Sequence, residues 1–166
     1  MLYNKRGGLN LLPKLQTYAN SVASIMATLA EGEPDINGWA SALAVPSLIR
    51  LCDEPADLIQ PASPALVLTY TGRSVAEPQL IYDYAVAVSY VYASPIERAW
   101  GDDALYACML AAEAVYQASR EARPAGVYSI NYSGHDISSM MTTSGTTPLL
   151  SRIMTADLLF QMEEDF

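Results

Sequence analysis

The longest alternation of hydrophobic and polar positions in this chain begins at Leu80 and continues to Tyr92. One face of the alternating segment carries the larger side chains, Tyr82, Tyr84, Val86, Val88, Tyr90 and Tyr92. The other face carries Ile81, Asp83, Ala85, Ala87, Ser89 and Val91. A period of two held over this length predicts a β-strand. Ser94-Pro95 ends it, because proline has no amide hydrogen to donate to a strand ladder.

Two segments have the three-to-four spacing of amphipathic helices. The first is predicted over 9–32, ending where Gly32 can take a left-handed cap conformation. Its apolar stripe consists of Leu9, Leu12, Leu15, Tyr18, Val22, Ile25, Met26 and Leu29. The second is predicted from Asp102, whose carboxylate can accept amide hydrogens of the first turn, to Ser119. Its stripe consists of Leu105, Cys108, Met109, Ala112, Val115, Tyr116 and Ser119. We expect both stripes to face the core.

Three further strands are predicted at Ala65–Tyr70, Val127–Tyr132 and Leu149–Met162. Ser133–Pro148 consists mostly of Ser, Thr, Gly and Met, which predicts a flexible loop. The first of these strands is expected to end at Thr71-Gly72. In this order, two predicted strands precede the second helix and two follow it.

Residues 33–63 are predicted to form an irregular connection, longer than usual between two elements. Prolines recur in it at positions 34, 46, 55 and 61, and a short helix within Ala40–Cys52 would be broken at Pro46. An insertion of this length is more often functional than idle.

The order of elements predicts an α+β fold, a small and mostly antiparallel sheet of about four strands with an N-terminal and a central helix packed on it. We expect residues 1–166 to form a single domain. Within it, residues 1–8 form a flexible arm hinged at Gly7-Gly8, 64–162 hold the sheet and central helix, and 163–166 form an acidic tail.

Hydrophobic residues make up 51% of the chain and charged residues only 16%, so we expect some apolar surface to be covered by another subunit. The formal net charge of −9 weighs against a groove that grips nucleic acid, because such grooves depend on clustered Lys and Arg. No apolar run reaches the roughly 18 residues of a membrane helix, and no signal-peptide core follows the N-terminus. We therefore expect a soluble protein without a cleaved signal and without a membrane partner.

The sequence offers little that indicates catalysis or cofactor binding. Cys52 and Cys108 lack metal-ligand spacing and are expected to be reduced core thiols, and one histidine cannot build a multi-histidine metal site. His135, Asp136 and the nearby serines lie on one predicted loop, whereas a catalytic triad needs groups held by fixed elements. Asp102-Asp103 is explained more simply by a helix cap than by a metal. We predict no enzyme activity, no metal and no cofactor.

The chain contains 11 tyrosines, most of them on predicted strands or helix stripes. A stacking platform for bases is one interpretation, but few basic residues lie nearby. Packing in strands and between subunits fits better, because tyrosine suits surfaces that are apolar with one hydrated end.

This order of elements resembles the tail terminator (tail completion) proteins of long-tailed bacteriophages, the lambda-type minor tail proteins. The resemblance covers roughly residues 9–30 and 64–162. The segments that carry it are the N-terminal helix, Pro64–Tyr70, Tyr82–Tyr90, Asp102–Ser119, Val127–Tyr132 and Arg152–Phe160.

The resemblance implies a structural virion protein of the tail and neck, assembled in the host cytoplasm. It would form a homo-oligomeric ring, a hexamer, that caps the tail tube, ends its polymerisation and contacts a neck or head-closure protein. DNA would pass through the lumen without specific binding, and the low basic content of the chain agrees with this.

Ring closure needs a heterologous interface, in which two different patches of the subunit meet. We expect the Arg73 tip and the Ser133–Pro148 loop to reach neighbours or the tube and to become ordered on assembly. The expected interface residues are Arg73, Tyr82, Tyr84, Tyr132, His135, Asp136, Met140, Met141 and Arg152.

Two alternatives remain open on the sequence. A head-completion or neck adaptor protein would share this architecture but would bind on the portal side. A small enzyme or ligand-binding domain would need convergent polar groups in a pocket between helix and sheet, and only His135 and Asp136 are suitable.

Overall fold

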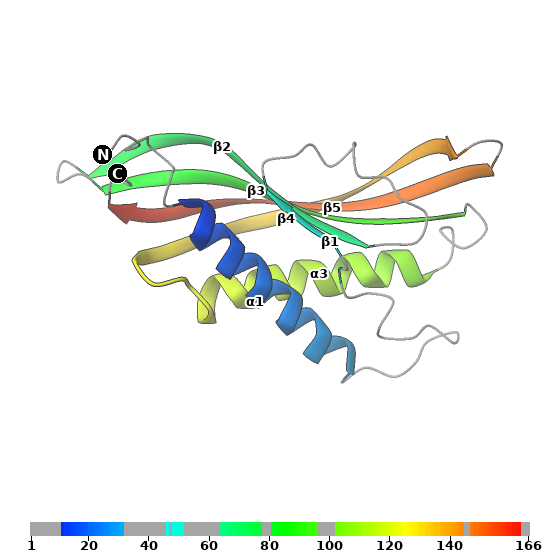
Figure 1. The fold of residues 1–166 in the computed structure, drawn as a ribbon, viewed down its shortest axis with the longest axis horizontal. Coiled ribbons are helices and arrows are strands. Elements are labelled where there is room, and N and C mark those ends of the chain that lie inside the picture. The colour runs from blue at the N-terminus through cyan, green and yellow to red at the C-terminus, as the bar shows by residue number, and fades with distance from the viewer. Residues whose placement is uncertain are drawn as a thin grey trace.

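Two helices pack on one face of a five-stranded sheet in the computed structural model of the chain (Figure 1). The structure describes residues 11–31, 46, 48–51, 64–77, 81–95, 102–144 and 147–163. The elements are α1 (Leu11–Glu31), β1 (Leu48–Leu51), β2 (Ala65–Glu77), β3 (Ile81–Pro95), α3 (Asp102–Glu121), β4 (Val127–Ser144) and β5 (Thr147–Glu163). The predicted α+β class is confirmed, with one strand more than expected.

The strands lie in the order β1-β2-β3-β5-β4. β1 pairs with β2 in parallel, and every other neighbouring pair is antiparallel. β3 and β5 therefore lie inside the sheet, and β4 lies at one edge of it.

β1 corrects the prediction for the segment before the first expected strand. Leu48–Leu51 pairs with Ala65–Leu68, where the sequence predicted an irregular connection with a possible short helix. Four residues are too short to show a period, so only the neighbouring edge of β2 defines this strand. Most of the predicted connection, together with the arm at 1–8, Cys52 and the end of the acidic tail at 164–166, lies outside the described residues.

The prediction of a flexible loop at Ser133–Pro148 is wrong. β4 continues to Ser144 and stays paired with β5, and the last partners of this long hairpin are Ser144 and Thr147. An edge strand with one solvated face tolerates Ser and Thr, and its partner supplies the hydrogen bonds that composition alone does not predict. β2 likewise continues past Thr71-Gly72 to Glu77, with register shifts after Tyr70 and after Val75.

The core lies between the helices and the sheet. The predicted inward face of β3 is confirmed by Tyr84, Val86, Val88 and Tyr90, all of which are buried. The Tyr18 ring of α1 meets Phe160 of β5 edge-on, with 5.2 Å between ring centroids. The Tyr18 hydroxyl lies 3.0 Å from the carbonyl oxygen of Val115 and 2.8 Å from Oγ of Ser119, which ties α1 to α3. Such a bond satisfies a polar group that would be costly to bury alone.

The apolar stripe predicted for α3 is only half correct. Cys108, Ala112, Val115 and Ser119 are buried, but Leu105, Met109 and Tyr116 are 38%, 53% and 37% exposed. The inward positions are instead occupied by five fully buried alanines, Ala104, Ala107, Ala111, Ala114 and Ala118. Small side chains let α3 approach α1 and the sheet closely, because interhelical distance depends on the residues at the contact. On α1, Leu12 was also expected inside and is 41% exposed, whereas Leu11 is buried.

Candidate subunit interface

A hollow of about 210 Å³ lies between α3 and β4. Its lining residues are Met109, Ala112, Glu113 and Tyr116 of α3 and Tyr132 and His135 of β4. Leu105 precedes Met109 by one helical turn, so the exposed apolar stripe of α3 continues into the hollow.

A β-bulge places both β4 side chains in this hollow. Tyr132 lies opposite Leu158 and His135 lies opposite Ala156, so Ser133 and Gly134 together face a single residue of β5. Without the extra residue, side chains three positions apart would point to opposite faces of the strand. Gly134 has φ +127°, a conformation that residues with a Cβ rarely adopt.

The polar groups in the wall of the hollow bind one another. The Tyr132 hydroxyl and Nδ1 of His135 are 2.7 Å apart. The ring of Tyr132 also packs against that of Tyr116, with 5.5 Å between centroids. Burial raises the pKa of Tyr132, and the Glu113 carboxylate raises it further. The surface left for an occupant is therefore mainly apolar, with one carboxylate beside it.

A second exposed group lies at the far end of β2. The register shift after Tyr70 pairs Arg73 with Tyr84 and Val75 with Tyr82, which turns Arg73 and Val75 to the helix side of the sheet. The guanidinium carbon of Arg73 lies 4.5 Å from the centre of the Tyr82 ring. Val75 is 70% exposed. We call Arg73 and Val75 the β2 tip.

The predicted interface residues therefore separate into groups. The structure brings together Tyr132 and His135 in the hollow and Arg73 and Tyr82 at the β2 tip. Tyr84 belongs to neither group, because it is fully buried beside Tyr70 and Tyr82. Its inward position on β3 places it in the core.

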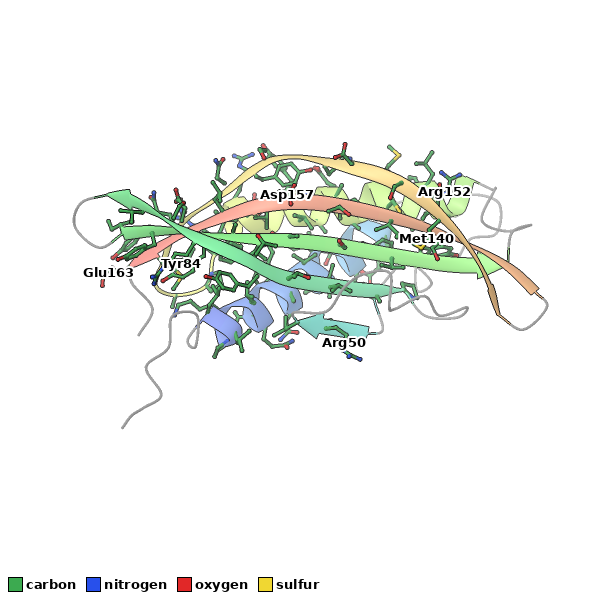
Figure 2. All side chains as sticks on the ribbon, turned by 90° about the horizontal axis from the view of Figure 1, so that it is seen from above. Arg50, Tyr84, Met140, Arg152, Asp157 and Glu163 are labelled. Atoms are coloured by element: carbon green, nitrogen blue, oxygen red, sulfur yellow. The ribbon has the colours of Figure 1, made fainter. Side chains whose placement is uncertain are left out.

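The other predicted residues lie elsewhere. Asp136 is exposed opposite Thr155, on the sheet face away from the helices. Met140 packs against a small cluster on that same face, formed by Ala65, Val67, Val91 and Ile153. Arg152 lies opposite Tyr92 and Ser139, and this register places it on the helix side. Figure 2 labels it near Met140. The side chain of Met141 lies outside the described residues.

His135 and Asp136 point to opposite faces of β4, because they are consecutive residues of one strand. The Asp136 carboxylate is therefore not placed to orient the imidazole. Among the residues that the structure describes, no three His, Cys, Asp or Glu side chains gather as a metal site would require. Neither α1 nor α3 is long and apolar enough to span a membrane.

Sequence reasoning missed the outward stripe of Leu105, Met109 and Tyr116 and the carboxylate of Glu113 as candidate interface residues. The signal was present in the alanines of α3, which recur at alternating spacings of three and four. That repeat marks a buried helix face. A helix with one such face and a second stripe of large apolar residues has more apolar surface than its own core can cover.

The sequence was also compared with known proteins. No protein-family model matches this chain, and no curated protein matches it.

Proposed function

We propose that this chain is a structural subunit of a phage tail, a tail terminator that assembles into a hexameric ring on the end of the tail tube. The ring would stop polymerisation of the tube and contact a neck or head-closure protein. The observation that carries this proposal is the uncovered apolar stripe of α3, Leu105, Met109 and Tyr116, which continues to Tyr132 on the edge strand β4.

An apolar stripe of this kind is a poor surface for a chain that stays alone in water. Tyr and Met are also enriched at the centres of protein interfaces. The hollow contains an aromatic pair and a single hydrogen-bonded polar pair, which suits packing against a partner better than chemistry on a small molecule. These features support an assembly subunit, and the order of elements supports the tail terminator class.

The sheet face away from the helices has the charge expected of a surface that DNA passes. Asp83, Asp136, Asp157 and Glu163 lie on that face by their strand register, and Figure 2 shows Asp157 and Glu163 on it. Arg50 of β1 pairs with Val67 and so lies on this face as well, where the four carboxylates outnumber it. Arg152, a basic residue of β5, lies on the opposite face. Carboxylates repel DNA phosphates, so a channel lined by this face would let DNA slide without binding.

Negative-stain electron microscopy of the purified full chain, alone and mixed with phage tail tubes, tests this function. We expect rings of six subunits with a central channel, and tubes carrying one ring at one end. Rings that leave tube ends bare but bind portal or neck proteins would replace the terminator with a neck adaptor. Single particles of one chain that never bind tubes would contradict the assembly function.

A further inference from the structure

We propose that the β2 tip of one copy docks in the hollow between α3 and β4 of the next copy. Val75 would fill the apolar part of the hollow, and Arg73 would pair with Glu113 beside it. This inference rests on the proposed ring and identifies its subunit contact.

The tip has the properties of an inserting group. Val75 is the most exposed of the large apolar side chains in the described part of the chain, at 70%. Arg73 lies on the same face two residues earlier, and its guanidinium stacks on the Tyr82 ring. Stacking restricts the long arginine side chain before it meets a partner, so less conformational entropy is lost on docking.

The hollow has the complementary properties. Met109, Ala112, Tyr116 and the Tyr132 ring form its apolar lining. The Tyr132 hydroxyl and His135 Nδ1 already bind each other, so an apolar occupant leaves neither atom unpaired. Glu113 is exposed beside this lining, where its carboxylate accepts a 3.5 Å hydrogen bond from Nε2 of Gln117. A volume of about 210 Å³ is ample for the side chain of one valine.

The spacing of the paired groups also matches. Arg73 and Val75 are separated by two strand residues, about 7 Å along β2. Glu113 and Met109 are separated by one helical turn, about 6 Å along α3. An apolar contact and an ion pair can therefore form at the same time.

The two surfaces both lie on the helix side of the sheet, but on different strands of it, β2 for the tip and the edge strand β4 for the hollow. β4 is an edge strand, and the hollow lies beside it. β2 pairs with β1 from Ala65 to Leu68 and no further. Among the described strands, the rest of β2, including the tip, therefore has β3 as its neighbour on one side and no strand on the other. Tip and hollow are thus two different patches, separated by the width of the sheet. A contact between them is heterologous and repeats from copy to copy until a ring closes.

Disulfide trapping tests the contact directly. The full chain carrying Cys52→Ser is made with Val75→Cys, with Met109→Cys, or with both, while the buried Cys108 is left in place. We expect the two single variants, mixed and mildly oxidised, to form a dimer of one copy of each. The double variant should form a ladder that ends at six chains. The control replaces Val75→Cys by Leu12→Cys, because Leu12 is 41% exposed on α1 and lies outside the proposed contact. It should give no dimer with Met109→Cys.

A charge swap tests the ion pair independently. Arg73→Glu and Glu113→Arg should each weaken association about tenfold, because each places like charges together in the contact. The double variant should recover most of the wild-type association. Glu121→Arg, an exposed change on the last turn of α3, should leave association unchanged.

The outcomes separate this contact from the proposed function. A six-chain ladder with rescue by the charge swap supports both. Rings by light scattering without Val75–Met109 crosslinks overturn the contact and leave the ring intact. A ladder that passes six chains without closing supports the contact and contradicts the ring. Single chains at every concentration, with no crosslink, overturn both.

Discussion

Tyr132 and His135 are three residues apart on β4, yet their side chains leave the same face of the strand and bind each other at 2.7 Å. The bulge at Ser133 and Gly134 makes this possible. A bulge on an edge strand also bends that strand and interrupts the regular row of donors and acceptors that another strand could use. The same feature therefore builds the wall of the hollow and limits uncontrolled pairing at this edge.

Replacing Gly134 by alanine should destabilise the chain by about 1–2 kcal/mol, because φ +127° is strained for any residue with a Cβ. The added Cβ would meet no atom within 4 Å, so steric crowding does not contribute. Urea unfolding measures the cost. Ser133→Ala, the neighbouring change in the same bulge, should stay within about 0.5 kcal/mol of the wild type. Equal effects of the two changes would contradict this geometry.

Tyr18→Phe should destabilise the chain by about 1 kcal/mol, because it removes the hydroxyl that bonds to Val115 and Ser119 while the ring keeps its contact with Phe160. Ser119 keeps its own 2.8 Å bond to the Val115 carbonyl, which limits the loss. Thermal or urea unfolding provides the measurement. Tyr116→Phe is the matched control, since its hydroxyl is bound by Arg120 in an exposed position. It should leave the free energy of unfolding nearly unchanged.

Cys108 should make the folded state sensitive to alkali. Burial raises the pKa of its thiol from an ordinary 9.0 to about 12, although Arg152 and a backbone hydrogen bond from Met154 lower it somewhat. Between these two values the unfolded chain loses the proton and the folded chain keeps it, so stability falls as pH rises. The loss is about 1.4 kcal/mol per pH unit at most.

Urea unfolding at a series of pH values from about 8 to about 11 compares the wild type with Cys108→Ala. The wild type should lose more stability than the variant as the pH rises above 9.0. The difference between their free energies of unfolding should therefore become smaller. Parallel losses in the two chains would show that other groups, such as the buried tyrosines, account for the alkaline sensitivity.

Met109→Gln should separate assembly from folding. The side chain is 53% exposed, so its replacement should change the free energy of unfolding by less than about 0.5 kcal/mol. Association should nevertheless weaken, because an amide would enter an apolar contact. Leu110→Gln is the matched change on the buried side of the same helix, where the residue is only 8% exposed. It should cost more than about 2 kcal/mol.

The parts of the fold that follow from strong periodicity were predictable. The alternation around Tyr84 and Tyr90 identified β3 and its inward face, and the helical spacing identified α1 and α3 within two residues of their ends. These patterns are local, and burial of the large side chains enforces them.

The parts that depend on a partner strand or on close packing were not predictable. Ser133–Ser144 has the composition of a loop and is a strand because β5 pairs with it along its length. Leu105, Met109 and Tyr116 were placed in the core because large apolar residues ordinarily occupy the inward face. Here alanines take that face, since α1 and the sheet lie close to α3. The pairing of Tyr132 with His135 depends on a bulge that no period reveals.

Light scattering of the purified full chain, over a concentration series, tests the central claim that its exposed apolar surfaces join copies into a closed ring. We predict one dominant species near six times the 18.0 kDa of a single chain, with a mass that stays constant as concentration increases. A mass of one chain at every concentration would contradict the claim. A mass that increases continuously with concentration would contradict closure.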